Sequence, residues 1–216
     1  MSHMDEKIIA MINGIEPSDY SVETSVGKQE EMPDVRQPIV RIGTEMVPFM
    51  KQRLLEDKIA VYMPKSFKLM TPSAAAIKYP SERRPGLIFT NDIGTINLAF
   101  NYTVNPLDES DIEPFRDAMV EMLKRMQPVL QWYEDGIKEI DGRSIGYCEF
   151  LTPAMNVNLY NLMFFVSLED RALLCTFNCI EDEMVDWKKI AINIMDTFEW
   201  NGFDKDLLLN PSENGG

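Results

Sequence analysis

The chain has 216 residues and a mass of 24.8 kDa, with 45% hydrophobic and 26% charged residues. This composition is typical of a globular protein with one large core, and it argues against disordered, collagen-like and membrane-spanning classes. Lys and Arg total 21 against 35 Asp and Glu, so the formal net charge is -14. Such a charge repels nucleic acid and anionic lipid, and we therefore expect neither of them as a partner.

The only histidine lies in a segment that looks foreign to the protein. Residues 1–4, Met-Ser-His-Met, match the remnant left when an affinity tag is cleaved, and we exclude them from the fold. Without His3 the protein lacks the group that activates serine or cysteine nucleophiles in triads and that often binds zinc. We find no secretory signal and no apolar run of about 18 residues, so we expect a cytoplasmic protein.

The cysteines indicate neither disulfides nor a metal. There are three of them, Cys148, Cys175 and Cys179, and no two form a C-x-x-C pair. Strand periodicity places Cys175 and Cys179 on one face with Phe177, which predicts buried thiols in a reducing compartment. The alternative is a reactive thiol. We expect no metal and no cofactor.

Composition divides the chain into four segments. After residues 1–4, an apolar pattern predicts a short helix over residues 5–15, followed by a polar, acidic linker to residue 38. A single domain is expected over residues 39–202. Residues 203–216 end in a polar, glycine-containing stretch and are expected to form a flexible tail.

The first half of the domain predicts two strand pairs around a short helix. Strand-like runs cover residues 47–55 and 59–63, and then residues 87–90 and 96–103. Between these pairs, Thr71-Pro72 is a typical helix start, and Tyr79-Pro80 ends the helix.

The second half predicts a long helix, two hairpins and a last helix. Ser110-x-x-Glu113 resembles a capping box at the start of a helix with an apolar stripe from Ile112 to Met126. Strands 136–140 and 145–151 flank the tight turn Asp141-Gly142, and strands 157–167 and 172–179 form the next hairpin. The last helix begins at the acidic run Glu181-Asp182-Glu183, which suits the helix macrodipole.

This order of elements predicts an α+β protein in which a mostly antiparallel sheet is sandwiched between helices. The segments Ile59 to Phe67 and Leu173 to Cys179, with the helix that ends near Phe198, resemble the PsbP subunit of the oxygen-evolving complex and the DcrB lipoprotein family. The resemblance covers about residues 45–200. It implies a PsbP-like αβα sandwich and a binding or assembly role without catalytic residues. We do not expect the secreted location of some family members here, because we find neither a signal peptide nor a lipobox cysteine in this sequence.

The most unusual local feature is the segment from Lys78 to Pro85. It holds three cations, Lys78, Arg83 and Arg84, and two prolines within eight residues of an acidic protein. Because proline restricts the backbone, the loop could present Arg83 and Arg84, together with Lys78 and Tyr79, to a carboxylate or phosphate of a ligand or partner. The alternative is that these cations pair with the protein's own carboxylates.

These features favour a non-enzymatic protein-binding, adaptor or assembly protein. One version is an immunity-type protein that caps a basic effector, since strong negative charge speeds encounter with a cationic partner. The alternative function is a small-molecule-binding protein or hydrolase with a cleft near residues 78–85. A homo-oligomer, in which the segment from Ile8 to Ile15 docks on a second copy, is a third hypothesis. We identify no catalytic residue.

Overall fold

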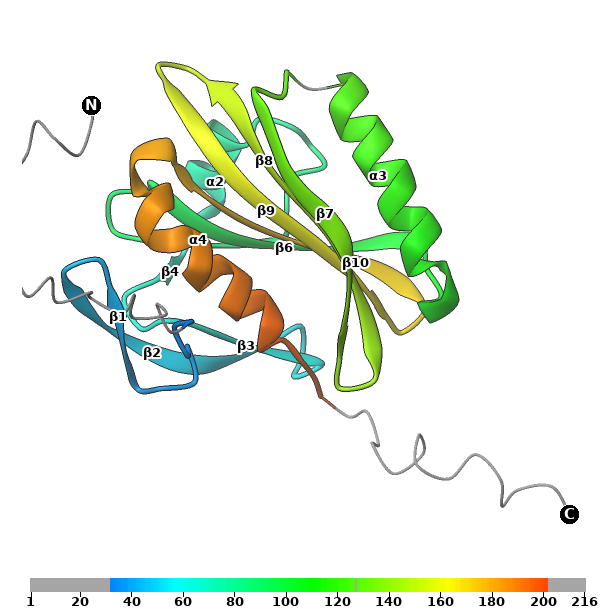
Figure 1. Ribbon diagram of the computed structural model, residues 1–216, viewed down its shortest axis with the longest axis horizontal. Helices are drawn as coiled ribbons and strands as arrows, with labels where there is room; N and C mark the ends of the chain where they lie inside the picture. Colours follow the sequence, from blue (N-terminus) through cyan, green and yellow to red (C-terminus); the bar gives the residue numbers. More distant parts are fainter. Residues whose placement is uncertain (1–31, 127, 202–216) are drawn as a thin grey trace, which may run out of the picture. The chain divides into compact units, whose positions relative to one another are not determined.

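The computed structural model describes residues 32–126 and 128–201, whose strands form two antiparallel sheets (Figure 1). The smaller sheet has the order β1-β2-β3-β11, with β1 Ile39–Ile42, β2 Glu45–Leu54, β3 Ile59–Pro64 and β11 Glu199–Trp200. The larger sheet has the order β4-β5-β6-β10-β9-β8-β7, with β4 Lys68–Leu69, β5 Leu87–Thr90, β6 Ile96–Pro106, β7 Gln131–Ile140, β8 Arg143–Ala154, β9 Val157–Leu168 and β10 Arg171–Ile180. The helices of the described residues are α2 Pro72–Lys78, the 3-10 turn η1 Glu109–Asp111, α3 Ile112–Met126 and α4 Glu181–Asp196.

The predicted α+β class and its hairpins are confirmed. The pairs β2–β3, β7–β8 and β9–β10 join strands that the sequence pattern had placed next to each other. Asp141 and Gly142 both have positive φ, 54° and 75°, as the tight turn between right-twisted strands requires. The predicted helix over residues 5–15 and the tail 203–216 lie outside the described residues.

The first hairpin belongs to a separate sheet, whereas we expected a single sheet. It pairs with β1 on one side and β11 on the other, and neither of these strands was predicted. β1 has four residues and β11 only two, which is too short for a periodic pattern to show. β3 ends at Pro64, and the chain then continues through residues 65–67 to β4 of the larger sheet.

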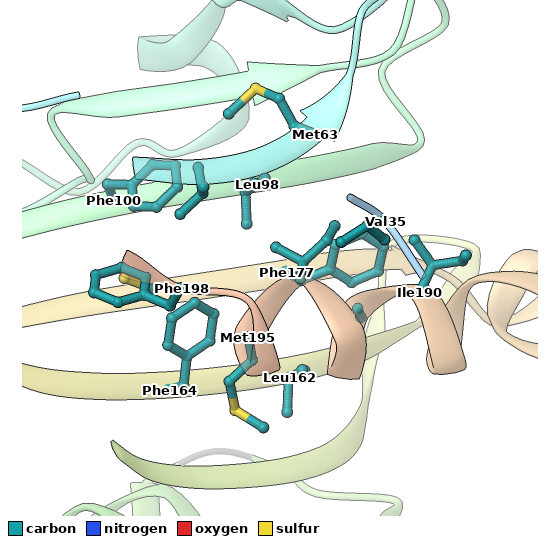
Figure 2. Packing of buried hydrophobic residues seen from close by; sticks show 14 of the residues in the cluster. Val35, Met63, Leu98, Phe100, Leu162, Phe164, Phe177, Ile190, Met195 and Phe198 are labelled. Atoms are coloured by element: carbon teal, nitrogen blue, oxygen red, sulfur yellow. The ribbon is translucent and has the colours of Figure 1, made fainter. Parts of the chain in front are cut away.

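The main core lies between the smaller sheet, α4 and one face of the larger sheet. Figure 2 labels Met63 of β3, Leu98 and Phe177 of the larger sheet, and Ile190 and Met195 of α4, which all belong to this core. All five side chains are buried. Val35, which precedes β1, belongs to the same core, and its N–H donates a 2.7 Å hydrogen bond to Asn193 Oδ1 of α4.

The opposite face of the larger sheet is covered by α2 and α3. Val120 and Leu123 of α3 pack on Cys148, Phe150 and Phe165. The expected apolar stripe is therefore present, although Met126 at its end is 71% exposed. These two helices and α4 cover the sheet from both sides, as predicted for a sandwich.

The start of α3 differs from the predicted capping box. Ser110 lies within η1, which continues directly into α3, and the N-cap residue Asp108 makes no side-chain cap hydrogen bond. The neighbouring Glu109 instead accepts hydrogen bonds from Arg143 and from the backbone N–H of Ser144. A partner distant in sequence thus uses the carboxylate at this helix start, and the local pattern could not reveal it.

Candidate docking site

Helix α2 positions the predicted site on the larger sheet. Thr71 caps the helix, because its Oγ1 accepts a 3.3 Å hydrogen bond from the N–H of Ala74. Ala75 is buried against Ile88 of β5 and Ala99 of β6, and this small side chain lets the helix lie close to the sheet. The last helical residue is Lys78, whose side chain points across the beginning of β6.

Lys78 makes its hydrogen bonds to neutral acceptors. Its Nζ lies 3.0 Å from Asn97 Oδ1 and also donates to the backbone carbonyl of Gly94. Asn97 is only 1% exposed, and its Nδ2 donates a 2.8 Å hydrogen bond to Asn178 Oδ1 of β10. Burial lowers the pKa of the Lys78 ammonium. Among the described residues, no carboxylate pairs with Lys78 to offset this burial.

Tyr79 continues the same polar group. Its hydroxyl is buried and has no hydrogen-bond partner within the described part of the chain. Burial raises the pKa of the Tyr79 phenol, and the nearby Asn178 amide partly offsets this effect. Lys78, Asn97, Asn178 and Tyr79 thus form one polar group where α2 ends on the sheet.

The two arginines lie in the loop that follows. Ser81 organises this loop, since its Oγ accepts from the N–H of Arg83 at 3.1 Å and its carbonyl accepts from the N–H of Arg84 at 3.2 Å. Arg83 is exposed, while the Nε of half-buried Arg84 is buried without a hydrogen-bond partner. Across residues 32–126 and 128–201, neither arginine forms an ion pair.

Asn97 and Asn178 were missed at the sequence level. Each interrupts an apolar strand, as Ile96-Asn97-Leu98 and as Phe177-Asn178-Cys179. They stand directly opposite each other in the β6–β10 register, so their side chains lie on the same face. The signal available was an asparagine inside two otherwise apolar strands, but only the strand pairing shows that they meet.

A second polar group lies on the other face of the larger sheet, under α4. Glu149 of β8 is 1% exposed and forms an ion pair with Lys188 of α4. The Lys188 Nζ also lies 4.6 Å from the centre of the Tyr133 ring. Burial and the Glu149 charge raise the pKa of the buried Tyr160 phenol. We did not predict this group.

An open cleft of about 470 Å³ lies between the β8–β9 turn and the start of α4, and none of residues 78–85 lines it. Its lining residues are Ala154, Asn156, Val157, Asn158, Ile180, Glu181 and Asp182. Asn158 Nδ2 donates a 2.7 Å hydrogen bond to Glu181 Oε2 there.

The three cysteines are buried, as their pattern predicted, and they form no disulfide. Burial raises the pKa of Cys148 and of Cys179 to about 12, so both stay protonated thiols at neutral pH. In the part of the chain that the structure describes, no group of three or more His, Cys, Asp or Glu residues is arranged to hold a metal ion. No helix of these residues is long and apolar enough to cross a membrane.

Comparison with known proteins identifies the architecture. No protein-family model and no curated protein matches the sequence. Among solved structures, cyanobacterial PsbP (CyanoP) from Synechocystis sp. PCC 6803 matches with a TM-score of 0.53 at 13% identity, over 73% of this chain and 95% of that one. The fold is PsbP-like.

Other solved structures match less closely. LpqN of Mycobacterium tuberculosis, described as involved in cell envelope biogenesis, has a TM-score of 0.44 at 12% identity, over 69% of this chain and 90% of that one. A Bacteroides thetaiotaomicron protein has a TM-score of 0.45 at 12% identity, over 70% of this chain and 48% of that one. At these identities the PsbP-like match concerns the fold alone.

Proposed function

We propose that this protein is a non-enzymatic protein-binding module, of the adaptor or assembly kind, that docks its partner on Lys78, Tyr79, Arg83 and Arg84. The observation that carries the proposal is that these three cations form no ion pair within the described residues, although the chain has a net charge of -14. In a protein with so many carboxylates, three neighbouring cations without one are available to a partner.

A binding role suits this surface better than catalysis. A hydrolase near the loop would need a nucleophile with a base, or two carboxylates in a cleft. Among the described residues, Lys78 has only carboxamide and backbone oxygens as hydrogen-bond partners, and the cleft lies beside Glu181 instead. We therefore prefer docking to the small-molecule and hydrolase alternative at this loop.

The test is affinity capture from a lysate of the native source. Wild-type protein is compared with Arg83→Glu/Arg84→Glu and with the matched control Arg36→Glu/Arg41→Glu, which changes the same charge at two other exposed arginines. We expect a protein that wild type and control retain, that the loop variant loses at least tenfold, and that high salt releases. Equal retention by all three forms would remove the proposal.

A second candidate function is an immunity-type protein that caps a basic effector. Glu181 and Asp182 line the cleft at the start of α4, and the exposed apolar side chains of Met155 and Val185 belong to the same two segments. Glu181→Gln/Asp182→Asn would then abolish capture of a basic protein, while Arg83→Glu/Arg84→Glu would not. For either function we propose a cytoplasmic location, supported by the three unpaired thiols.

A further inference from the structure

We infer that the partner presents a carboxylate flanked by apolar side chains to Lys78, as an acidic and apolar protein segment. This inference rests on the proposed docking function and specifies its partner. Three observations meet at the residue: an ammonium with spare hydrogen-bonding capacity, a rigid support beneath it, and exposed apolar side chains beside it.

The ammonium has unused capacity. A lysine ammonium carries three N–H donors. Lys78 Nζ uses donors on Gly94 O and Asn97 Oδ1, which leaves one donor and the full positive charge. A carbonyl and a carboxamide oxygen are neutral, so neither balances that charge. A carboxylate supplies both an acceptor and a negative charge, and such charge-assisted hydrogen bonds are roughly twice as strong as neutral ones.

Asn97 holds the ammonium in place. Its Nδ2 is committed to Asn178 at 2.8 Å, and that bond turns its Oδ1 toward Lys78. Both carboxamides lie on strands of the larger sheet and are buried. The lysine is therefore ordered before the partner arrives, which reduces the side-chain entropy that binding would otherwise cost. By contrast, Lys68 on β4 is exposed and already paired with Asp92.

Two exposed apolar side chains adjoin this hydrogen-bonded pair in the sequence. Ile77 is 84% exposed and Ile93 is 78% exposed. Ile77 precedes Lys78, and Ile93 precedes Gly94, so they adjoin the two residues that the Lys78 hydrogen bond joins. Single exposed apolar residues are common, but here two of them adjoin the two residues joined by a cation that has no carboxylate partner among the described residues. A protein segment can cover both isoleucines, whereas a nucleic acid would meet the repulsion of the net charge of -14.

Carbodiimide cross-linking in the capture experiment tests the contact directly. This reagent joins an amine to a carboxylate only where the two groups touch, so mass spectrometry identifies the partner's residue. We expect Lys78 cross-linked to an Asp or Glu of the captured protein that has apolar neighbours in its sequence. Captured partner whose cross-links never include Lys78 would overturn the inference and leave the proposed docking function standing. Loss of capture altogether would instead count against the docking function.

Two variants separate the contact from folding. Asn97→Asp places a carboxylate on the protein's own Lys78, and the matched control Asn101→Asp makes the same change further along β6. We expect at least tenfold weaker capture for Asn97→Asp and wild-type capture for the control.

If Asn97→Asp fails to fold, the surface variant Ile93→Asp tests the same contact by capture, and Val104→Asp is its control. Both positions are highly exposed, so folding is unaffected. We again expect at least tenfold weaker capture for Ile93→Asp alone. Undiminished capture by the folded Asn97→Asp or Ile93→Asp variant would overturn the inference.

Discussion

Two lysines on opposite faces of the larger sheet have opposite electrostatic surroundings. Lys188 of α4 pairs with Glu149, a carboxylate that is 1% exposed. Lys78 at the end of α2 has, among the described residues, only a carboxamide oxygen and a backbone carbonyl as hydrogen-bond partners. The first lysine is needed because a buried carboxylate without a counter-charge is very costly. The second has no charged partner among the described residues, which is the observation behind the proposed docking role.

The largest effect is expected for Lys188→Met. This change leaves Glu149 buried without its counter-charge, and we expect the free energy of unfolding to fall by about 3 kcal/mol, the lower end for such pairs because Lys188 is itself partly exposed. Urea denaturation measures the loss. Lys65→Met, at an exposed lysine of the β3–β4 connection, is the control and is expected to change stability by about 0.5 kcal/mol or less. A loss below about 1 kcal/mol for Lys188→Met would mean that the pair is not structural.

Neutralising both members should restore part of the loss. Glu149→Gln/Lys188→Met keeps the shape of the buried side chain but needs no counter-charge. We expect this double variant to lose about 1.5 kcal/mol relative to wild type, which is less than Lys188→Met alone. A double variant less stable than the single one would show that the Glu149 charge has a further partner, with the Tyr160 hydroxyl as the first candidate.

Lys78→Met should have a smaller effect, and this result would sharpen the contrast. The lost hydrogen bonds to Asn97 and to the Gly94 carbonyl together cost about 1–2 kcal/mol, and removal of a poorly compensated charge offsets part of this cost. The lowered pKa of Lys78 means that the folded state disfavours the charged amine. The charge therefore lowers the free energy of unfolding at neutral pH. We expect unfolding to stay within about 1 kcal/mol of wild type, measured as for Lys188→Met. A loss of about 3 kcal/mol would make Lys78 structural too.

Local patterns were sufficient for most of the fold. The Asp141-Gly142 turn, the start of α2 at Thr71-Pro72 and the acidic start of α4 were all visible, because each depends on a few neighbouring residues. β1 and β11 were not predicted, because they are short and take their stability from β2 and β3. The division into two sheets depends on which strands pair, and alternation within a strand does not specify its partner.

Only part of the candidate site could be predicted from the sequence, again because local patterns do not specify which strands pair. Lys78, Tyr79, Arg83 and Arg84 are consecutive or nearly so, and the sequence could single them out by composition. Asn97 and Asn178 lie on strands far apart in sequence, and only the β6–β10 register joins them. Glu149 of β8 and Lys188 of α4 are likewise separated in sequence, by the β9–β10 hairpin. Groups made by long-range pairing of one residue from each strand leave no local pattern.

The smallest change in the free energy of unfolding is expected at Glu183. This carboxylate is near Lys78 but belongs to α4, on the other face of the larger sheet. Lys78 bonds to Gly94, while Glu183 accepts a 2.9 Å hydrogen bond from the hydroxyl of the next residue, Thr95. The second carboxylate oxygen of Glu183 is buried without a partner among the described residues. Burial raises the pKa of the Glu183 carboxyl, and the Thr95 hydrogen bond opposes this shift. Lys78 and Glu183 form no ion pair with each other in the described structure.

Glu183→Gln tests this arrangement through its pH dependence. Because the folded pKa is raised, ionised Glu183 weakens the fold at neutral pH, and this penalty disappears as pH falls through the folded pKa toward the ordinary value of 4.5. Glu183→Gln should therefore be more stable relative to wild type at pH 7 than at pH 4, by urea denaturation. Asp182→Asn, at an exposed carboxylate of the same first turn, measures the opposing macrodipole effect together with the loss of the Asp182 charge, which also raises the pKa of Glu183. If both variants show the same pH dependence, Glu183 is as well solvated as its neighbour Asp182. Lys78 would then be the one uncompensated charge at this end of β6 among the described residues.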